Sequence, residues 1–92
     1  MKQYELEYRG IQLRIEINDM MISSLYINGI HRDSGAPSLT GYCGLSSSVQ
    51  TDYEWHEFIK ADIVVNESEV IIKLSANNEA LGAKSFTLDT AS

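Results

Sequence analysis

Three side chains in this sequence belong to types that support nucleophilic or metal chemistry: Cys43, His31 and His56. A cysteine nucleophile needs a general base, and the two histidines are the candidates for that role. Neither histidine stands at a spacing from Cys43 that is typical of cysteine enzymes. The glycines form neither a phosphate-binding loop nor a dinucleotide fingerprint. The sequence therefore predicts no catalytic residue, and we expect a protein that is not an enzyme.

A metal ion is the second chemistry to consider, because carboxylates flank His56. On a strand, Glu54 and His56 would share one face, and Glu57 would point to the other. One histidine with one or two acids is fewer than the three or four ligands that zinc requires. His31 or Asp33 would have to complete such a site, and nothing in the sequence requires that. We predict no metal ion and no cofactor.

The same segment has the composition of a contact surface for another protein. Residues 50–79 contain two lysines and seven acidic residues, a net charge of −5 in a chain whose total is −6. Aromatic residues are enriched where interfaces concentrate their binding energy, and acidic patches accelerate the encounter with basic partners. The alternative is that Trp55 and Phe58 belong to the core and that the acids only confer solubility. The candidate binding residues are Asp52, Tyr53, Glu54, Trp55 and Glu57.

Length and charge narrow the class of protein further. The 92 residues suit one domain, over 1–92, and their 13 acidic against 7 basic residues argue against binding to nucleic acid. The same balance argues against an anionic membrane surface, and no apolar run approaches the roughly 20 residues of a membrane span. A single cysteine excludes an internal disulfide and fits a reducing cytoplasm.

The elements that must position these residues are strands. Apolar and polar residues alternate over 2–9 and 11–18, which is the pattern of a strand with one buried face. A turn at Arg9 and Gly10 would place Leu6 opposite Leu13 and a glutamate opposite an arginine, so both faces agree on one register. Two further turns are predicted, at 18–19 and at Asn28 followed by Gly29, the second of which is a strong hairpin signal. The first of these would pair Ile17 with Met20 and Ile15 with Ile22.

The alternation of apolar and polar residues is interrupted in the middle of the chain. Residues 34–50 contain the single proline and three glycines, and we predict a long loop there with one weak strand near 39–45. Alternation returns over 56–65 and 69–75, and a turn between them would pair Asp62 with Lys73. That register also places Val64 opposite Ile71 on the outer face, where a partner or another element would cover them. Residues 83–89 are predicted to form a last strand.

One stretch resembles a known kind of protein. Residues 7–16, with Tyr8, Arg9 and Gly10, are followed by 25–29, a strand that runs into Asn28 and Gly29. This order resembles the start of small bacterial all-β proteins of unknown function, in which a Tyr-x-Gly hairpin precedes a strand ending in an Asn-Gly or Asp-Gly turn. The resemblance spans residues 7–29. It implies a compact antiparallel fold and transfers no active site.

These patterns predict an all-β fold, a small antiparallel β-sandwich or flattened barrel of six to eight strands joined mostly as meander hairpins. The leading functional hypothesis is a non-enzymatic interaction module that binds a basic protein through residues 52–58. A first alternative is a homodimer or larger assembly formed through strand edges and the Val64/Ile71 tip. A second alternative is a small-ligand or metal site built from Cys43, His31 or His56. The expected core comprises Tyr4, Leu6, Leu13, Ile15, Ile17, Ile22, Ile27, Ile63, Val65, Val70, Ile72, Leu74 and Phe86.

Overall fold

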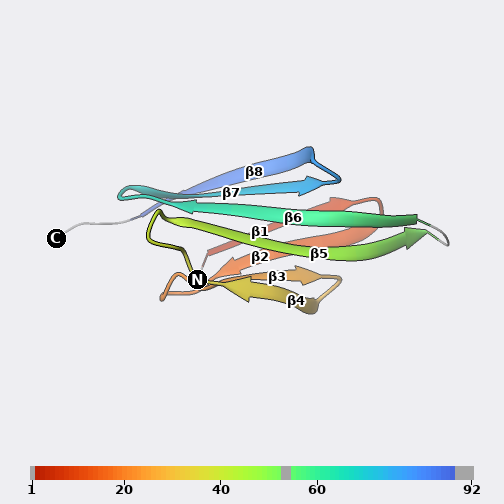
Figure 1. Ribbon diagram of the computed structural model, residues 1–92, viewed down its shortest axis with the longest axis horizontal. Helices are drawn as coiled ribbons and strands as arrows, with labels where there is room; N and C mark the ends of the chain where they lie inside the picture. The colour runs from red at the N-terminus through yellow and green to blue at the C-terminus, as the bar shows by residue number, and fades with distance from the viewer. Residues whose placement is uncertain (1, 53–54, 89–92) are drawn as a thin grey trace.

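The protein is a β-sandwich. The computed structural model describes residues 2–52 and 55–88, and over these residues it contains eight antiparallel strands in two four-stranded sheets that pack face to face (Figure 1). Each sheet is a meander, in the orders β1-β2-β3-β4 and β5-β6-β7-β8, and the sheets do not close into a barrel. The strands are β1 (Lys2–Tyr8), β2 (Ile11–Ile17), β3 (Ser23–Ile27), β4 (Ile30–Gly35), β5 (Tyr42–Asp52), β6 (Trp55–Val65), β7 (Glu69–Ala76) and β8 (Glu79–Thr87).

Alternation of apolar and polar side chains explains both sheets. Along β2 every second side chain is buried, and β6 and β7 repeat the pattern with Ile59, Ile63 and Ile72 facing inward. Since successive side chains of a strand point to opposite faces, each such strand gives one face to the core and one to solvent. The predicted all-β sandwich is therefore confirmed. The buried apolar residues are Ile11, Leu13, Ile15, Ile17, Leu25, Ile27, Cys43, Leu45, Val49, Ile59, Ala61, Ile63, Val70, Ile72, Leu74 and Ala76.

Three predicted registers are confirmed. The β1–β2 hairpin places Leu6 opposite Leu13, the β3–β4 hairpin turns at Asn28 and Gly29, and the β6–β7 hairpin aligns both faces as expected. In the β1–β2 and β6–β7 hairpins the two faces of the strands require the same register, so a slip by one residue would bury charge. The outer-face pairs include Glu5 with Arg14, Asp62 with Lys73 and Val64 with Ile71.

The predicted turn between β2 and β3 is wrong. Ile17 pairs with Ser23 rather than with Met20, because residues 18–22 form a wider connection than the two-residue turn that was expected. The wider connection moves the register of β3 so that Ser23 and Leu25 face the core. Ile22, which was expected in the core, is consequently exposed.

The predicted long loop over 34–50 is also wrong for most of its length. Strand β4 continues to Gly35, and β5 begins at Tyr42 and runs for 11 residues, so that residues 36–41 connect the two. Cys43, Leu45 and Val49 of β5 face the core, and small polar side chains occupy much of its outer face. Serine and glycine are typical of turns, but on an edge strand they only need to cover a solvent-exposed face.

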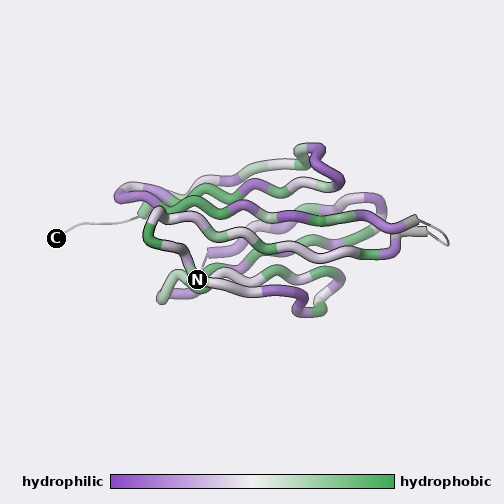
Figure 2. Tube along the Cα trace, viewed as in Figure 1, coloured by the Kyte–Doolittle hydropathy of each residue, from purple (hydrophilic) through white to green (hydrophobic). Residues whose placement is uncertain are grey.

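The antiparallel order divides the connections between the two ends of the sandwich. The β2–β3, β4–β5 and β6–β7 connections lie at one end, on the left of Figure 1, and the β1–β2, β3–β4 and β7–β8 turns lie at the other. Figure 2 shows hydrophobic colour on the β4–β5 connection at the left end, whereas the β6–β7 connection at the same end and the β1–β2 and β7–β8 turns at the other end are hydrophilic. We refer to the end that carries the β1–β2, β3–β4 and β7–β8 turns as the hydrophilic end.

Candidate interaction surface

Three of the five binding residues predicted from the sequence, Asp52, Trp55 and Glu57, lie toward the hydrophilic end of the sandwich. Asp52 and Trp55 pair at the ends of β5 and β6, and Tyr53 and Glu54 lie outside the described residues. Glu57 points into the sandwich and is 1% exposed, so its carboxylate does not contribute to an exposed acidic surface. The neighbouring Phe58 was considered for the core, but its ring is exposed on the outer face of β6.

Glu57 joins the two sheets at this end of the core. The Tyr8 hydroxyl hydrogen-bonds to its carboxylate, and Arg9 Nη1 lies 3.5 Å from Oε1. Glu57 Oε2 has no hydrogen-bond partner in the described structure. The hydrogen bond to Glu57 is the main reason why the pKa of Tyr8 is raised above its ordinary value. Burial of a carboxyl group carries a desolvation cost, which the contacts with Arg9 and Tyr8 offset in part.

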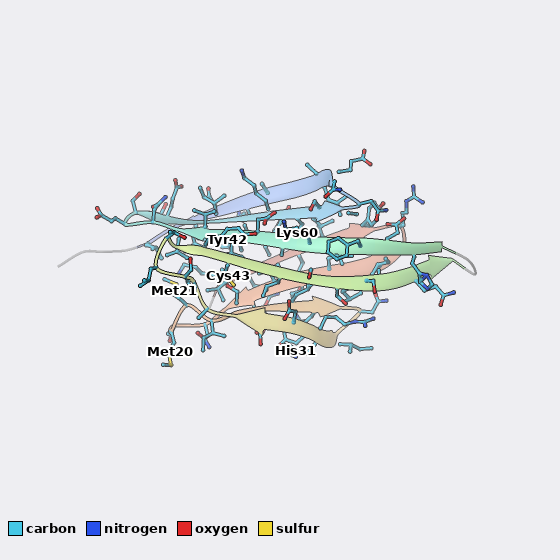
Figure 3. The ribbon with its side chains drawn as sticks, viewed as in Figure 1. Met20, Met21, His31, Tyr42, Cys43 and Lys60 are labelled. Atoms are coloured by element: carbon cyan, nitrogen blue, oxygen red, sulfur yellow. The ribbon has the colours of Figure 1, made fainter. Side chains whose placement is uncertain are left out.

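The three side chains considered for nucleophilic or metal chemistry lie in different parts of the molecule, and Figure 3 labels two of them, Cys43 and His31. Cys43 is buried in the core, and burial together with the Asp33 carboxylate raises the pKa of its thiol. His31 lies on the outer face of the first sheet, with its ring 5.4 Å from that of Tyr26. His56 is exposed on the outer face of the second sheet. Among the described residues no group of three or more metal-ligating side chains is gathered.

Among the residues whose side chains the structure describes, large apolar side chains are exposed mainly at the end that carries the β2–β3, β4–β5 and β6–β7 connections. Among the described residues, five of the seven exposed large hydrophobic side chains lie on or beside the β2–β3, β4–β5 and β6–β7 connections. The other two, Ile30 and Phe58, lie toward the hydrophilic end. Single exposed apolar residues are ordinary, but a group of them indicates an interaction site. The five residues, which we name the apolar loop end, are Met20, Ile22, Leu39, Tyr42 and Val64.

The β2–β3 connection holds Met20 outward in a hydrogen-bonded loop. Asn18 Oδ1 accepts hydrogen bonds from the backbone N–H groups of Met20 at 2.9 Å and Ile22 at 3.0 Å. The N–H of Met21 donates to the carbonyl of Asn18, and Met21 has a φ of 63°, which is uncommon for a residue other than glycine or asparagine. Met21 packs against the core, while Met20 is 80% exposed (Figure 3).

The β4–β5 connection presents Leu39 in a similar way. The Gly41 N–H donates to the Ser38 carbonyl at 2.9 Å, which closes a β-turn with Leu39 at its tip, and the Leu39 side chain is fully exposed. Gly41 has a φ of 83°, and its carbonyl accepts a hydrogen bond from Val65 N–H at 2.7 Å. A β-carbon at Gly41 would collide with the Val65 carbonyl. This connection is therefore fixed against the end of β6.

Tyr42 and Val64 continue the apolar surface onto the second sheet. They pair across β5 and β6, and Ile71 of β7 is the next residue in the same row. The Tyr42 hydroxyl donates to Asp62 Oδ1 at 2.5 Å, which fixes the ring and raises the pKa of Tyr42. The doubly apolar tip expected at Val64 and Ile71 is thus present, and through Tyr42 it adjoins the β4–β5 connection.

The strand edges carry features that oppose pairing with another chain. At the β4–β5 side, the ladder shifts around Arg32, and Asp33 Oδ2 accepts a hydrogen bond from the Ser46 N–H of β5 at 3.0 Å. On β8, Lys84 lies on the inner side of the sheet opposite Ile72 and remains exposed. Bulges and charged residues directed inward are common means of preventing edge-to-edge association.

Sequence reasoning missed the apolar loop end because its signal is weak. Turns are expected to be polar, and Met20 and Leu39 are apolar residues next to turn formers, Asn18 with Asp19 in one case and Ser38 in the other. An apolar residue at a predicted turn was therefore the signal that could have indicated an exposed contact residue. It could not be separated from ordinary strand residues until the β2–β3 register and the start of β5 were known.

Comparison of the chain with models of protein families, with curated proteins and with solved structures finds no match. The resemblance at residues 7–29 therefore reaches only as far as a small all-β protein. The part of the chain that the structure describes forms no helix long and apolar enough to cross a membrane.

Proposed function

We propose that this protein is a non-enzymatic interaction module and that the apolar loop end is its contact surface for another protein. The supporting observation is that two hydrogen-bonded turns each hold a large apolar side chain, Met20 and Leu39, in solvent. Exposing these side chains contributes nothing to the core of the free protein. Burial of each against a partner would contribute about 1.5–3 kcal/mol.

The fixed geometry of the two turns also favours binding. Asn18 and the Ser38–Gly41 turn order the backbone on either side of the apolar tips before any partner arrives. Association loses less conformational entropy when loops are already ordered, so a small surface reaches a higher affinity. Interfaces typically concentrate their energy in a few such anchor residues.

The proposal is tested by affinity capture from a lysate of the source organism with four forms of the protein as bait. The forms are wild type, M20S/L39S, I30S and E54A/W55A. Ile30 is 60% exposed at the opposite end, so I30S is a matched control for the loss of exposed apolar surface. We expect M20S/L39S to lose proteins that wild type, I30S and E54A/W55A retain.

Equal capture by wild type and M20S/L39S would show that the apolar loop end is not the contact surface. A loss restricted to E54A/W55A would instead assign the contact to residues 52–58, as the sequence-based hypothesis has it. Assembly through strand edges is a weaker candidate, because Asp33 and Lys84 protect two of the four edges.

A further inference from the structure

The charge around the apolar loop end is mainly negative. Lys2, which pairs with Ile17 at the start of β1, is the one basic residue among the first and last residues of the described strands at this end. The three connections at this end, residues 18–22, 36–41 and 66–68, contain Asp19 and Glu67 and no lysine or arginine. Glu69 follows as the first residue of β7, and Glu67 is exposed. The apolar tips therefore stand within an acidic rim, which we define as Asp19, Glu67 and Glu69.

Another protein, a membrane surface or a second copy of this chain could cover the apolar loop end, and the acidic rim disfavours the last two. A membrane surface rich in anionic lipids would repel the carboxylates. A second copy, joined end to end about a two-fold axis, would place the rim of one molecule against the same rim of the other. Like charges brought together in an interface are costly. Complementarity instead favours a protein surface whose apolar pockets are bordered by lysine or arginine.

We propose that the partner of the apolar loop end is a basic protein segment, with apolar pockets that receive Met20 and Leu39 and with basic side chains that face Glu67 and Glu69. This inference rests on the proposed function, since it specifies the chemistry of the partner at that same surface. The two parts of the surface have different roles. Apolar burial supplies most of the affinity, and the rim raises the association rate and selects partners by charge.

A library of random peptides displayed on phage provides a probe that does not depend on knowing the partner. Peptides are selected on wild type and counter-selected on M20S/L39S, and the binders are then synthesised and measured by fluorescence anisotropy at low and high salt. We expect the selected peptides to combine large apolar residues with lysine or arginine. Their affinity is expected to fall about tenfold at high salt, because screening weakens exposed charge pairs.

Two charge-reversal variants separate the rim from the net charge of the chain. E67K/E69K reverses the rim, and E5K/E7K makes the same change of charge on the outer face of β1, which belongs to the other sheet. We expect E67K/E69K to weaken peptide binding about tenfold and E5K/E7K to weaken it much less. Circular dichroism would check that both variants keep the wild-type fold, because E5K also places a positive charge opposite Arg14.

Each other outcome overturns the inference in a distinct way. Selected peptides without basic residues, equal losses in the two charge variants, or no enrichment at all would show that the partner is not a basic segment. Binding of wild type but not M20S/L39S to phosphatidylcholine vesicles would favour a lipid surface, and reversible dimers lost in M20S/L39S on sedimentation would favour a second copy. Peptides that bind M20S/L39S as well as wild type would contradict the proposed function itself.

Discussion

At the scale of single residues, the buried Glu57 carboxylate is the most unusual group in the described structure. It is held on the inner face of β6, where neighbouring inward positions are apolar, and the Tyr8 hydroxyl and Arg9 guanidinium reach it from the β1–β2 hairpin. Removal of one member of such a buried group leaves the others with unpaired charge or hydrogen-bonding capacity. Glu57 therefore couples the β1–β2 hairpin to the second sheet.

The titration of Tyr8 reports this coupling. The Glu57 hydrogen bond is the largest cause of the raised pKa of Tyr8, and the charge of Glu79 is the smallest. E57Q is therefore expected to lower the Tyr8 pKa toward its ordinary value, and the control E79Q should lower it less. Nuclear magnetic resonance of labelled tyrosine across alkaline pH would measure both shifts. Identical Tyr8 titration in wild type and E57Q would contradict the assigned contact.

The raised pKa of Tyr8 also determines whether the stability of the fold rises or falls with pH in the alkaline range. Because folding raises the Tyr8 pKa, the folded state favours the protonated hydroxyl. The resulting stabilisation is fully present below the pKa of tyrosine in the unfolded chain and is lost as pH rises through the folded-state pKa. The Tyr42 hydroxyl, bonded to Asp62, acts in the same direction.

At the scale of elements, the two sheets repeat one design. In each meander an asparagine directly follows the third strand, and its side-chain oxygen accepts a hydrogen bond from a backbone N–H of the second strand. Asn28 accepts from Gln12, and Asn77 accepts from Phe58, each at 2.9 Å. An asparagine directly after the second strand, Asn18 or Asn66, accepts two backbone N–H groups of the following connection. Side-chain amides that satisfy nearby backbone groups are typical of asparagine in turns. The two sheets therefore share the same strand arrangement and the same positions of the asparagines that bond to the backbone.

This correspondence gives a matched pair of variants. Asn18→Ala removes the acceptor for the N–H groups of Met20 and Ile22, and Asn66→Ala removes the equivalent acceptor in the β6–β7 connection. We expect each variant to lower the free energy of unfolding by about 1–2 kcal/mol. Only Asn18→Ala should also release Met20 and weaken binding at the apolar loop end. Denaturant unfolding and peptide binding would be measured on both, and unchanged stability in N18A would contradict the role given to Asn18.

At the scale of the whole molecule, stability and recognition are carried by different apolar residues. The core lies between the sheets, and Leu25 and Ile63 are among its fully buried members, whereas Met20 and Leu39 lie outside it. Burial of apolar area is the main stabilising contribution to folding, and an exposed side chain makes little of it. The residues proposed for recognition are therefore free to change without loss of the fold.

This separation predicts opposite effects of two kinds of substitution. Leu25→Ala is expected to cost about 2–5 kcal/mol of stability, because it removes buried methyl groups and leaves a cavity. M20S/L39S is expected to stay within about 0.5 kcal/mol of wild type, as surface substitutions usually do. Denaturant unfolding monitored by circular dichroism would compare them. A loss in M20S/L39S as large as that in L25A would mean that these side chains stabilise the fold.

The sequence by itself determined the pairing of those strands whose register is specified by their own side chains. In the β1–β2 and β6–β7 hairpins, alternation places apolar residues opposite apolar residues and Glu5 or Asp62 opposite a basic residue, so the pairing follows from the side chains of two adjacent segments. The all-β class follows from the same local information, because period-two alternation requires no knowledge of distant parts of the chain.

Where this local information was insufficient, only the tertiary structure determined the strand pairing and the burial of side chains. Asn18 and Asp19 permit a tight turn, but burial of Ser23 and Leu25 against the second sheet selects the wider connection and exposes Ile22. Residues 42–50 form a strand because β6 supplies their backbone partners, which no property of their serines and glycines indicates. Glu57 is buried and Met20 and Leu39 are exposed for the same reason. The packing of one sheet on the other, not residue type, decides which side chains meet solvent.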